Sequence, residues 1–279
     1  MQKRVIAIHD ISCVGRCSLT VALPILSAAG LEASVLPTAI LSTHTGGFTG
    51  YTYRDLTADM LPIAEHWKSL NLRADAFYTG YLGSFEQLEI VEKIIDMLRN
   101  ENTTVLVDPV MADNGILYSG FSPDFPKGMA KLCAKADIVA PNLTEAAFLL
   151  GEAYVGADYD RAYIEGLLRR LAALGPKTVV LSGVSFEKGK LGAAAYDREA
   201  DVSRYYFREE IDGYFHGTGD VFGSALLAAF MQGRELADTI RIAVDFTVDS
   251  IRRTAASGSE ARYGVDFEEA LPGLIQSLK

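Results

Sequence analysis

Short apolar runs rich in β-branched residues alternate with longer stretches of helical spacing along most of this chain. The runs predict strands at residues 4–8, 34–41, 76–79, 104–107, 138–140 and 178–181. The longer stretches predict helices at residues 17–29, 56–70, 85–99, 220–231, 236–254 and 267–278. Such alternation is typical of parallel βαβ units whose helices cover both faces of one sheet. We therefore expect an α/β fold with a mostly parallel central sheet.

The segment at residues 191–207 departs from this alternation. Two apolar or aromatic runs flank a polar stretch at 197–201, which predicts an antiparallel hairpin. The chain contains no linker rich in Pro, Gly or Ser, no internal repeat and no low-complexity tract. A length of 279 residues can build one large core. We therefore expect residues 1–279 to form a single domain.

The composition is that of an ordinary globular protein with an acidic surface. Hydrophobic residues make up 49% of the chain, and the formal net charge is −10. This charge argues against nucleic acid or an anionic membrane as a partner. No apolar run is long enough to span a bilayer, and no leader pattern is present, so we expect a cytoplasmic protein. Cys13, Cys17 and Cys133 fit neither a disulfide framework nor a zinc signature, and we expect reduced, buried thiols.

The run from His216 to Asp220 reads His-Gly-Thr-Gly-Asp and precedes an apolar helical stretch. Glycines at 217 and 219 allow backbone torsions closed to other residues and close approach of a ligand. The free N–H groups of a first helical turn attract anions such as phosphate. Asp220 beside such a site is a candidate base for the group that receives the phosphate. Alternatively, Thr218 or Asp220 only caps the helix.

Polar or glycine-containing turns follow several of the predicted strands, where an open α/β sheet places its ligands. Asp108 follows the fourth strand and Glu145 lies shortly after the fifth. Mg²⁺ commonly joins one or two carboxylates to nucleotide phosphates, and these two residues suit that role. The other turns contain the segments 9–12, 42–47, 80–84 and 141–144.

Each of these residues also has a structural explanation. Asn142 or Thr144 together with Glu145 can cap the helix that follows. Asp108 precedes a proline, which disfavours helix at that position and can simply end a strand. Tyr81 can serve only as a packed aromatic side chain. The joint occurrence of these residues at successive strand ends, ahead of the glycine run, favours a functional site.

With these motifs in place, the chain resembles the pyridoxal kinase family of the ribokinase-like superfamily along nearly its whole length. The matching motifs, in the order of the family, are Ser12 after the first strand and the segments 42–46, 80–83, 108–111, 141–145 and 217–220. The resemblance implies a three-layer α/β/α sandwich. It also implies transfer of the γ-phosphate of ATP to the 5′-hydroxymethyl group of pyridoxal, pyridoxine or pyridoxamine, and a homodimer.

The resemblance assigns the substrate side of the site as follows. Ser12 would bind the polar edge of the pyridine ring, and Thr45 and Gly46 would line the same pocket. Tyr81 would contact or cover the ring. Asp220 would accept the proton of the attacking hydroxyl.

The resemblance also assigns the nucleotide side. Asp108 and Glu145 would organise Mg²⁺, and with it a monovalent cation such as K⁺, around the triphosphate, and Asn142 would support them. Ser182 and the hairpin beyond it would flank the nucleotide, with the hairpin region closing as a lid. The anion hole would be formed by Gly217, Thr218 and Gly219.

Two other functions remain open from the sequence. A hydroxymethylpyrimidine kinase would share the fold and would also act on a hydroxymethyl group of a flat nitrogen ring. A catalytically silent protein that binds pyridoxal phosphate would need neither Asp220 nor the two metal carboxylates.

Overall fold

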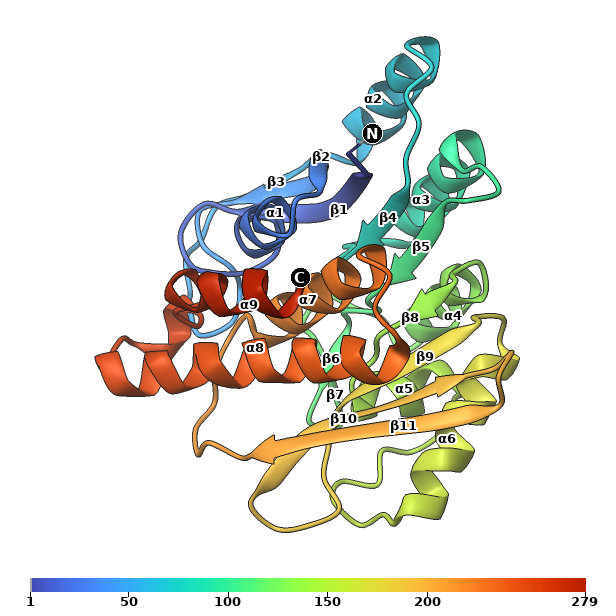
Figure 1. Cartoon of the computed structure of the whole chain (residues 1–279). Helices are drawn as coiled ribbons and strands as arrows, with labels where there is room; N and C mark the ends of the chain where they lie inside the picture. Colours follow the sequence, from blue (N-terminus) through green and yellow to red (C-terminus); the bar gives the residue numbers. More distant parts are fainter. Residues whose placement is uncertain (1) are drawn as a thin grey trace.

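The computed structural model describes residues 2–279, and within them nine strands form one central sheet in the order β11-β10-β9-β8-β5-β4-β1-β2-β3 (Figure 1). From β9 to β2 the neighbouring strands run parallel, whereas β3, β10 and β11 pair antiparallel. The strands are β1 (Arg4–Ser12), β2 (Glu32–Leu41), β3 (Tyr53–Asp55), β4 (Ala76–Thr79), β5 (Thr104–Val107), β8 (Ile138–Val139), β9 (Thr178–Val184), β10 (Lys190–Asp197) and β11 (Val202–Glu209). A small separate hairpin joins β6 (Ala112–Asp113) to β7 (Ile116–Leu117).

Helices cover both faces of the sheet. One layer contains α1 (Leu19–Ala28), α7 (Thr218–Met231), α8 (Leu236–Ser257) and α9 (Leu271–Ser277). The other contains α2 (Thr57–Ser69), α3 (Phe85–Leu98), α4 (Phe125–Ala134), α5 (Leu143–Leu149) and α6 (Arg161–Ala173). Short 3-10 turns lie at Ala261–Tyr263 and Glu268–Ala270. In Figure 1 the orange and red helices α7, α8 and α9 lie in front of the strands.

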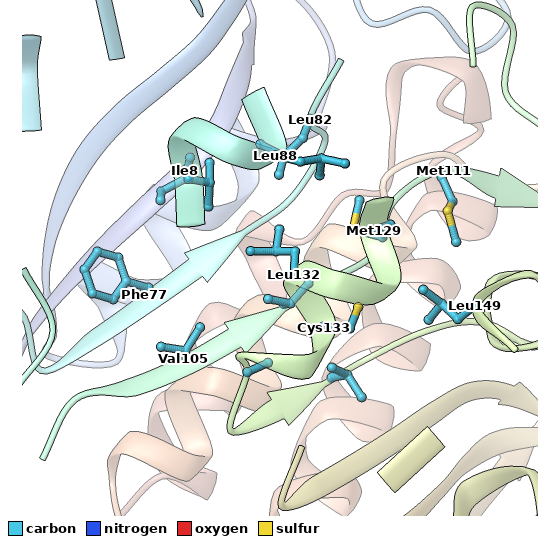
Figure 2. Packing of buried hydrophobic residues seen from close by; sticks show 14 of the residues in the cluster. Ile8, Phe77, Leu82, Leu88, Val105, Met111, Met129, Leu132, Cys133 and Leu149 are labelled. Carbon is cyan, nitrogen blue, oxygen red and sulfur yellow. The ribbon is translucent and has the colours of Figure 1, made fainter. Parts of the chain in front are cut away.

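The core consists of two hydrophobic layers, one on each face of the sheet. In β1, Ile6 and Ile8 pack with α2–α6, whereas Val5 and Ala7 pack with α1 and α7–α9. This division follows from the two-residue side-chain period of a strand, and it explains why a strand buried on both faces is apolar throughout. Figure 2 shows the first layer, with Phe77 and Val105 from neighbouring strands among its members.

The predicted three-layer α/β architecture is confirmed. The strands β4 and β5 have the bounds predicted for them, 76–79 and 104–107. The hairpin predicted at 191–207 is present as β10 and β11. The pattern did not assign α4, α6, β3 or the β6–β7 hairpin. The three missed strand segments are two or three residues long, too short to show a period.

The first strand is longer than the predicted 4–8. β1 continues to Ser12, so His9, Asp10 and Ser12 lie within the strand and not in the turn after it. The parallel pairing with β2 shifts register between His9 and Ile11 and continues to Ser12 opposite Leu41. His9, Asp10 and Ser12 interrupt the apolar run, so the sequence pattern predicts an end of the strand that comes too early.

Two further predictions require correction. The C-terminal helix predicted at 267–278 is divided into the 3-10 turn Glu268–Ala270 and α9, because Pro272 near the start of α9 has no N–H to continue a helix from the preceding turn. Of the three free cysteines, Cys17 and Cys133 are buried as expected, but Cys13 is exposed. Cys13 directly follows β1, and its backbone N–H donates to the carbonyl oxygen of Leu41 in β2.

Candidate active site

The glycine run forms the tight entry to α7. Gly217 is the N-cap and has a φ of 75°, in the left-handed region that favours glycine. A β-carbon at Gly217 would also lie 2.0 Å from the carbonyl oxygen of Arg16, so only glycine fits. Gly219 differs from the prediction, because it lies inside the helix without a positive φ. A β-carbon there would meet no atom within 4 Å, which leaves the first turn of α7 open to a ligand.

Asp220 lies in the first turn of α7 but does not cap the helix. Its Oδ2 accepts a hydrogen bond of 2.8 Å from the backbone N–H of Ser18, and its side chain is 16% exposed. Burial raises the pKa of Asp220 to about 7, which the bond from Ser18 partly opposes. A carboxylate with this pKa exchanges a proton near neutral pH, as a general base requires. The alternative of a simple cap at Thr218 is also excluded, because its hydroxyl donates to the carbonyl oxygen of Phe215.

Asp108 follows β5 directly and approaches α7 at Gly223. A β-carbon at Gly223 would lie 3.5 Å from Oδ2 of Asp108 and 2.5 Å from the hydroxyl oxygen of Tyr78. Burial raises the pKa of Asp108 well above its ordinary value, and the charges of Glu145 and Asp220 raise it further. A cation beside Asp108 would offset the repulsion that these two charges exert on its ionised form.

Glu145 has a structural role that was one of the alternatives from the sequence. Asn142 is the N-cap of α5, its Oδ1 accepts from the N–H of Glu145, and Oε2 of Glu145 accepts from the N–H of Asn142. The other oxygen, Oε1, accepts from the N–H of Met111 at 3.1 Å. Asn142 is likewise engaged, since its side-chain amide donates to the carbonyl oxygen of Ala112. The capping box therefore fixes Glu145 beside Asp108, and burial raises the pKa of Glu145 to about 8.

The metal site expected from the sequence would use two carboxylates, Asp108 and Glu145. Within residues 2–279, no three His, Cys, Asp or Glu side chains gather as a metal-binding group. Mg²⁺ keeps several waters and uses one or two carboxylates together with phosphates, so the pair formed by Asp108 and Glu145 fits that ion.

On the substrate side, Ser12 is fully buried and its hydroxyl donates to Oδ2 of Asp10 at 3.1 Å. Asp10 is 4% exposed, and its charge contributes to raising the pKa of Tyr81, after the burial of that phenol. Tyr81 is half-buried, with its ring centroid 5.6 Å from that of Phe121. The structure therefore brings Ser12, Tyr81 and Asp10 to the same end of the sheet.

The loop after β2 reaches the loop before α7. A β-carbon at Gly46 would lie 2.6 Å from the His216 ring, and the rings of His44 and His216 have centroids 5.2 Å apart. Nε2 of His44 lies 2.7 Å from the carbonyl oxygen of Arg262. Thr45 is exposed. Gly46 is therefore a packing position against His216, and Thr45 is free to face a ligand.

Ser182 lies in β9 and donates its backbone N–H to the carbonyl oxygen of Pro141, so it adjoins the start of α5. The hairpin beyond it extends the central sheet. β10 pairs with β9 in the central sheet, and Ala193, Ala194 and Ala195 are fully buried. β11 is the edge strand of the sheet, and its residues are half-buried or exposed, so a lid in this region stays a prediction.

Three residues of this region were not assigned a role from the sequence: His9, Asp10 and Ser18. The His9 imidazole is fully buried, lies 4.0 Å from Oδ1 of Asp220, and finds no hydrogen-bond partner among residues 2–279. Burial lowers the pKa of His9 to about 3, so the ring is neutral. Asp10 belongs to the polar segment 9–12, but only the structure shows that its carboxylate accepts hydrogen bonds from Ser12 and Ser18. Nothing near Ser18 in the sequence points to Asp220.

Comparison with known proteins gives a consistent picture. Residues 23–264 match the family model described as phosphomethylpyrimidine kinase. A Bacteroides thetaiotaomicron protein assigned as a phosphomethylpyrimidine kinase and crystallised with pyridoxal is 38% identical, with a TM-score of 0.94 over 98% of this chain and 96% of that chain. The pyridoxal kinase of Lactobacillus plantarum is 30% identical, with a TM-score of 0.90 over 99% and 97% of the two chains.

A curated relative is also a pyridoxal kinase. The pyridoxal kinase of Sus scrofa is 30% identical over 77% of this chain and 70% of its own length. Among residues 2–279, no helix has the length and apolar character needed to cross a membrane. The glycine-bounded turn at α7 and the carboxylates at the strand ends lie within the matched residues. This chain belongs to the phosphomethylpyrimidine kinase family.

Proposed function

We propose that this protein is an ATP-dependent kinase of B6 vitamers that phosphorylates the 5′-hydroxymethyl group of pyridoxal, pyridoxine or pyridoxamine. The observation that carries the proposal is the placement of Asp220. Its carboxylate is held at the first turn of α7 by Ser18, beside an open anion-binding turn, with a pKa of about 7. The pyridoxal-containing relative and the pyridoxal kinases reported above support the choice of substrate.

The reaction follows from these positions. Asp220 accepts the proton of the 5′-hydroxyl as its oxygen attacks the γ-phosphorus of ATP. A new phosphorus–oxygen bond forms, the bond from the γ-phosphorus to the bridging oxygen breaks, and ADP leaves. Gly217, Thr218 and Gly219 offer the N–H groups of the helix start to the transferred phosphoryl group, which stabilises the charge that develops on it.

The cation requirement is part of the same proposal. Asp108 and Glu145 would hold Mg²⁺, which would neutralise the charge of the triphosphate, and a monovalent cation such as K⁺ would lie nearby. Asn142 holds Glu145 through the capping box, and Ser182 would flank the nucleotide. Ser12, Thr45, Gly46 and Tyr81 would surround the pyridine ring. We propose further that residues 1–279 act as one catalytic domain in a cytoplasmic homodimer.

Turnover of four substrates in parallel tests the proposal. Pyridoxal, pyridoxine, pyridoxamine and hydroxymethylpyrimidine are incubated with ATP and Mg²⁺, and each phosphorylated product is followed by mass. Preferential turnover of a B6 vitamer supports the proposal, whereas preferential turnover of the pyrimidine assigns the protein to the activity after which its family is described. If none of the four is phosphorylated, a silent binding protein becomes the better account.

The Asp220→Asn variant tests the mechanism. Asparagine keeps an oxygen acceptor for the N–H of Ser18 but cannot take up the proton. We expect turnover to fall by about 10²-fold or more, while binding of the vitamer and of ATP is retained. An unchanged rate would exclude Asp220 as the base.

A further inference from the structure

Ser18 has an unusual backbone conformation for a residue with a side chain. Its φ of 57° and ψ of −129° lie in a region where glycine is at ease and other residues are strained. Ser18 precedes α1, but its side chain makes no capping hydrogen bond, and the residue is 8% exposed. Helix capping therefore does not explain why a serine occupies this position. Strain of this kind persists only where surrounding contacts impose it.

Two contacts account for the conformation. The backbone N–H of Ser18 donates to Oδ2 of Asp220 at 2.8 Å, and its hydroxyl donates to Oδ1 of Asp10 at 2.6 Å. Glycine could provide the first contact without strain, but it could not provide the second. The side chain at position 18 is thus explained by its bond to Asp10.

Asp10 is a buried carboxylate that is held by hydroxyl groups and has no cation. Its Oδ2 accepts from Ser12, its Oδ1 accepts from Ser18, and no Lys or Arg side chain among residues 2–279 forms an ion pair with it. The groups whose titration responds to its charge are Tyr53, Tyr81, His44, Cys17 and Asp220, which surround the substrate side of the site. A carboxylate in this setting is suited to accept a hydrogen bond from a ring N–H or another donor of a flat nitrogen heterocycle.

We propose that Ser18 is a positioning residue that fixes the base and the ring-binding carboxylate relative to each other. Its N–H holds Asp220 where the substrate hydroxyl reacts, and its hydroxyl holds Asp10 where the heterocycle binds. The spacing between the two carboxylates is thereby matched to a substrate whose hydroxymethyl group and ring donor are both engaged at once. This inference rests on the proposed function, because it requires a heterocyclic alcohol as the substrate.

Two variants separate the hydroxyl group from the backbone strain. Ser18→Ala removes the hydroxyl and keeps the strained φ, whereas Ser18→Gly removes the hydroxyl and relieves the strain. Both keep the N–H that binds Asp220. We expect both variants to raise the KM of the heterocyclic substrate about tenfold, as for loss of a hydrogen bond to a charged group. The kcat and the KM of ATP should stay close to those of the wild type.

The melting temperature provides a second readout. Relief of strain should make Ser18→Gly melt about 2–4 °C above Ser18→Ala, although the two share the same defect in KM. A purely structural serine would instead give a glycine variant that binds substrate like the wild type. Ser27→Ala is the matched control, because Ser27 lies on α1 and is exposed, away from the site. Ser27→Ala should change neither the KM of the heterocyclic substrate nor the melting temperature.

Each outcome decides the inference. A raised substrate KM in both variants, with kcat retained, supports it. A wild-type KM in either variant overturns it, as does a parallel loss of kcat and of affinity for ATP. The assays use whichever heterocycle the wild type phosphorylates, so the proposed function is judged on the wild type and the role of Ser18 on the variants. A wild type that phosphorylates none of the four substrates overturns both.

Discussion

The carbonyl oxygen of Arg16 lies 2.0 Å from the position that a β-carbon of Gly217 would occupy. The segment that follows β1 therefore packs directly on the turn that opens α7, and it brings Ser18 to Asp220. The left-handed φ of Gly217 imposes the same residue type independently. Two separate constraints, the φ angle and the contact with Arg16, therefore require glycine at position 217.

Replacing this glycine should damage both folding and activity. Gly217→Ala would place a methyl group against a backbone atom and strain the φ angle, so we expect a loss of about 1–3 kcal/mol in the free energy of unfolding. Urea unfolding followed by circular dichroism measures this loss. Turnover should fall as well, because the turn also positions Asp220. An alanine variant with the stability of the wild type would show that the segment moves away easily.

The neighbouring glycine should respond in the opposite way. Gly219→Ala adds a methyl group in open space at a helical position, which stabilises a helix by about 0.5–1 kcal/mol. If ATP phosphates bind there, the methyl group should raise the KM of ATP by about tenfold or more.

Gly166→Ala provides the control for that experiment. Gly166 lies in α6, and a β-carbon there also meets no atom within 4 Å. It should give a similar gain in stability without any effect on ATP. An unchanged KM of ATP in Gly219→Ala would place the phosphates elsewhere.

The activity should depend on pH through Asp220. The base must be ionised, and burial raises its pKa to about 7, so kcat should be half of its limiting value near pH 7 and fall about tenfold for each unit below it. A pH–rate profile from pH 5.5 to 9 measures this. A profile that is flat down to pH 5.5 would mean that substrate binding lowers this pKa or that another group is the base.

Protonation of Asp220 below pH 7 does not destabilise the fold, so unfolding caused by this protonation cannot explain the loss of kcat. The folded protein binds the proton of Asp220 more tightly than the unfolded chain, whose Asp titrates near 3.9. This group therefore makes the fold more stable as the pH falls from about 7 toward 4, and less stable as the pH rises through that window. Melting temperatures recorded over the same range serve as the control.

Asp108 should show a trade-off between stability and activity. Within residues 2–279 its carboxylate has no cationic partner, and burial raises its pKa well above the ordinary value, so its ionised form destabilises the fold in the absence of metal. Asp108→Asn should raise the melting temperature in EDTA at pH 8. The same variant should raise the Mg²⁺ concentration for half-maximal activity by about tenfold or more.

The direction in which Asp108→Asn shifts the melting temperature in EDTA tests this account of its stability. A lower melting temperature in EDTA would mean that the carboxylate has a structural partner in the folded protein. An unchanged Mg²⁺ requirement would remove Asp108 from the metal site.

Much of this protein follows from local sequence. The alternation of strand and helix patterns identified the parallel sheet, because side-chain periods of 2 and 3.6 are properties of each segment alone. The capping box of Asn142 and Glu145 is local as well, since it depends on residues within one turn. The left-handed φ of Gly217 is also local, whereas its contact with Arg16 is tertiary. The order of polar groups at the strand ends predicts that Asp108 and Asp220 lie near each other, and the charge of Asp220 contributes to the raised pKa of Asp108.

Other features were decided only by the tertiary structure. The extension of β1 to Ser12 depends on pairing with β2, and the burial of β10 depends on its pairing with β9. The bond between Ser18 and Asp220 joins residues that are 202 positions apart in the chain. No helical or strand period relates such positions, because their approach results from the way the whole sheet brings α1 and α7 together. The sequence alone therefore identified the chemical groups of this site, and the packing of α1, β1 and α7 determined which of them touch.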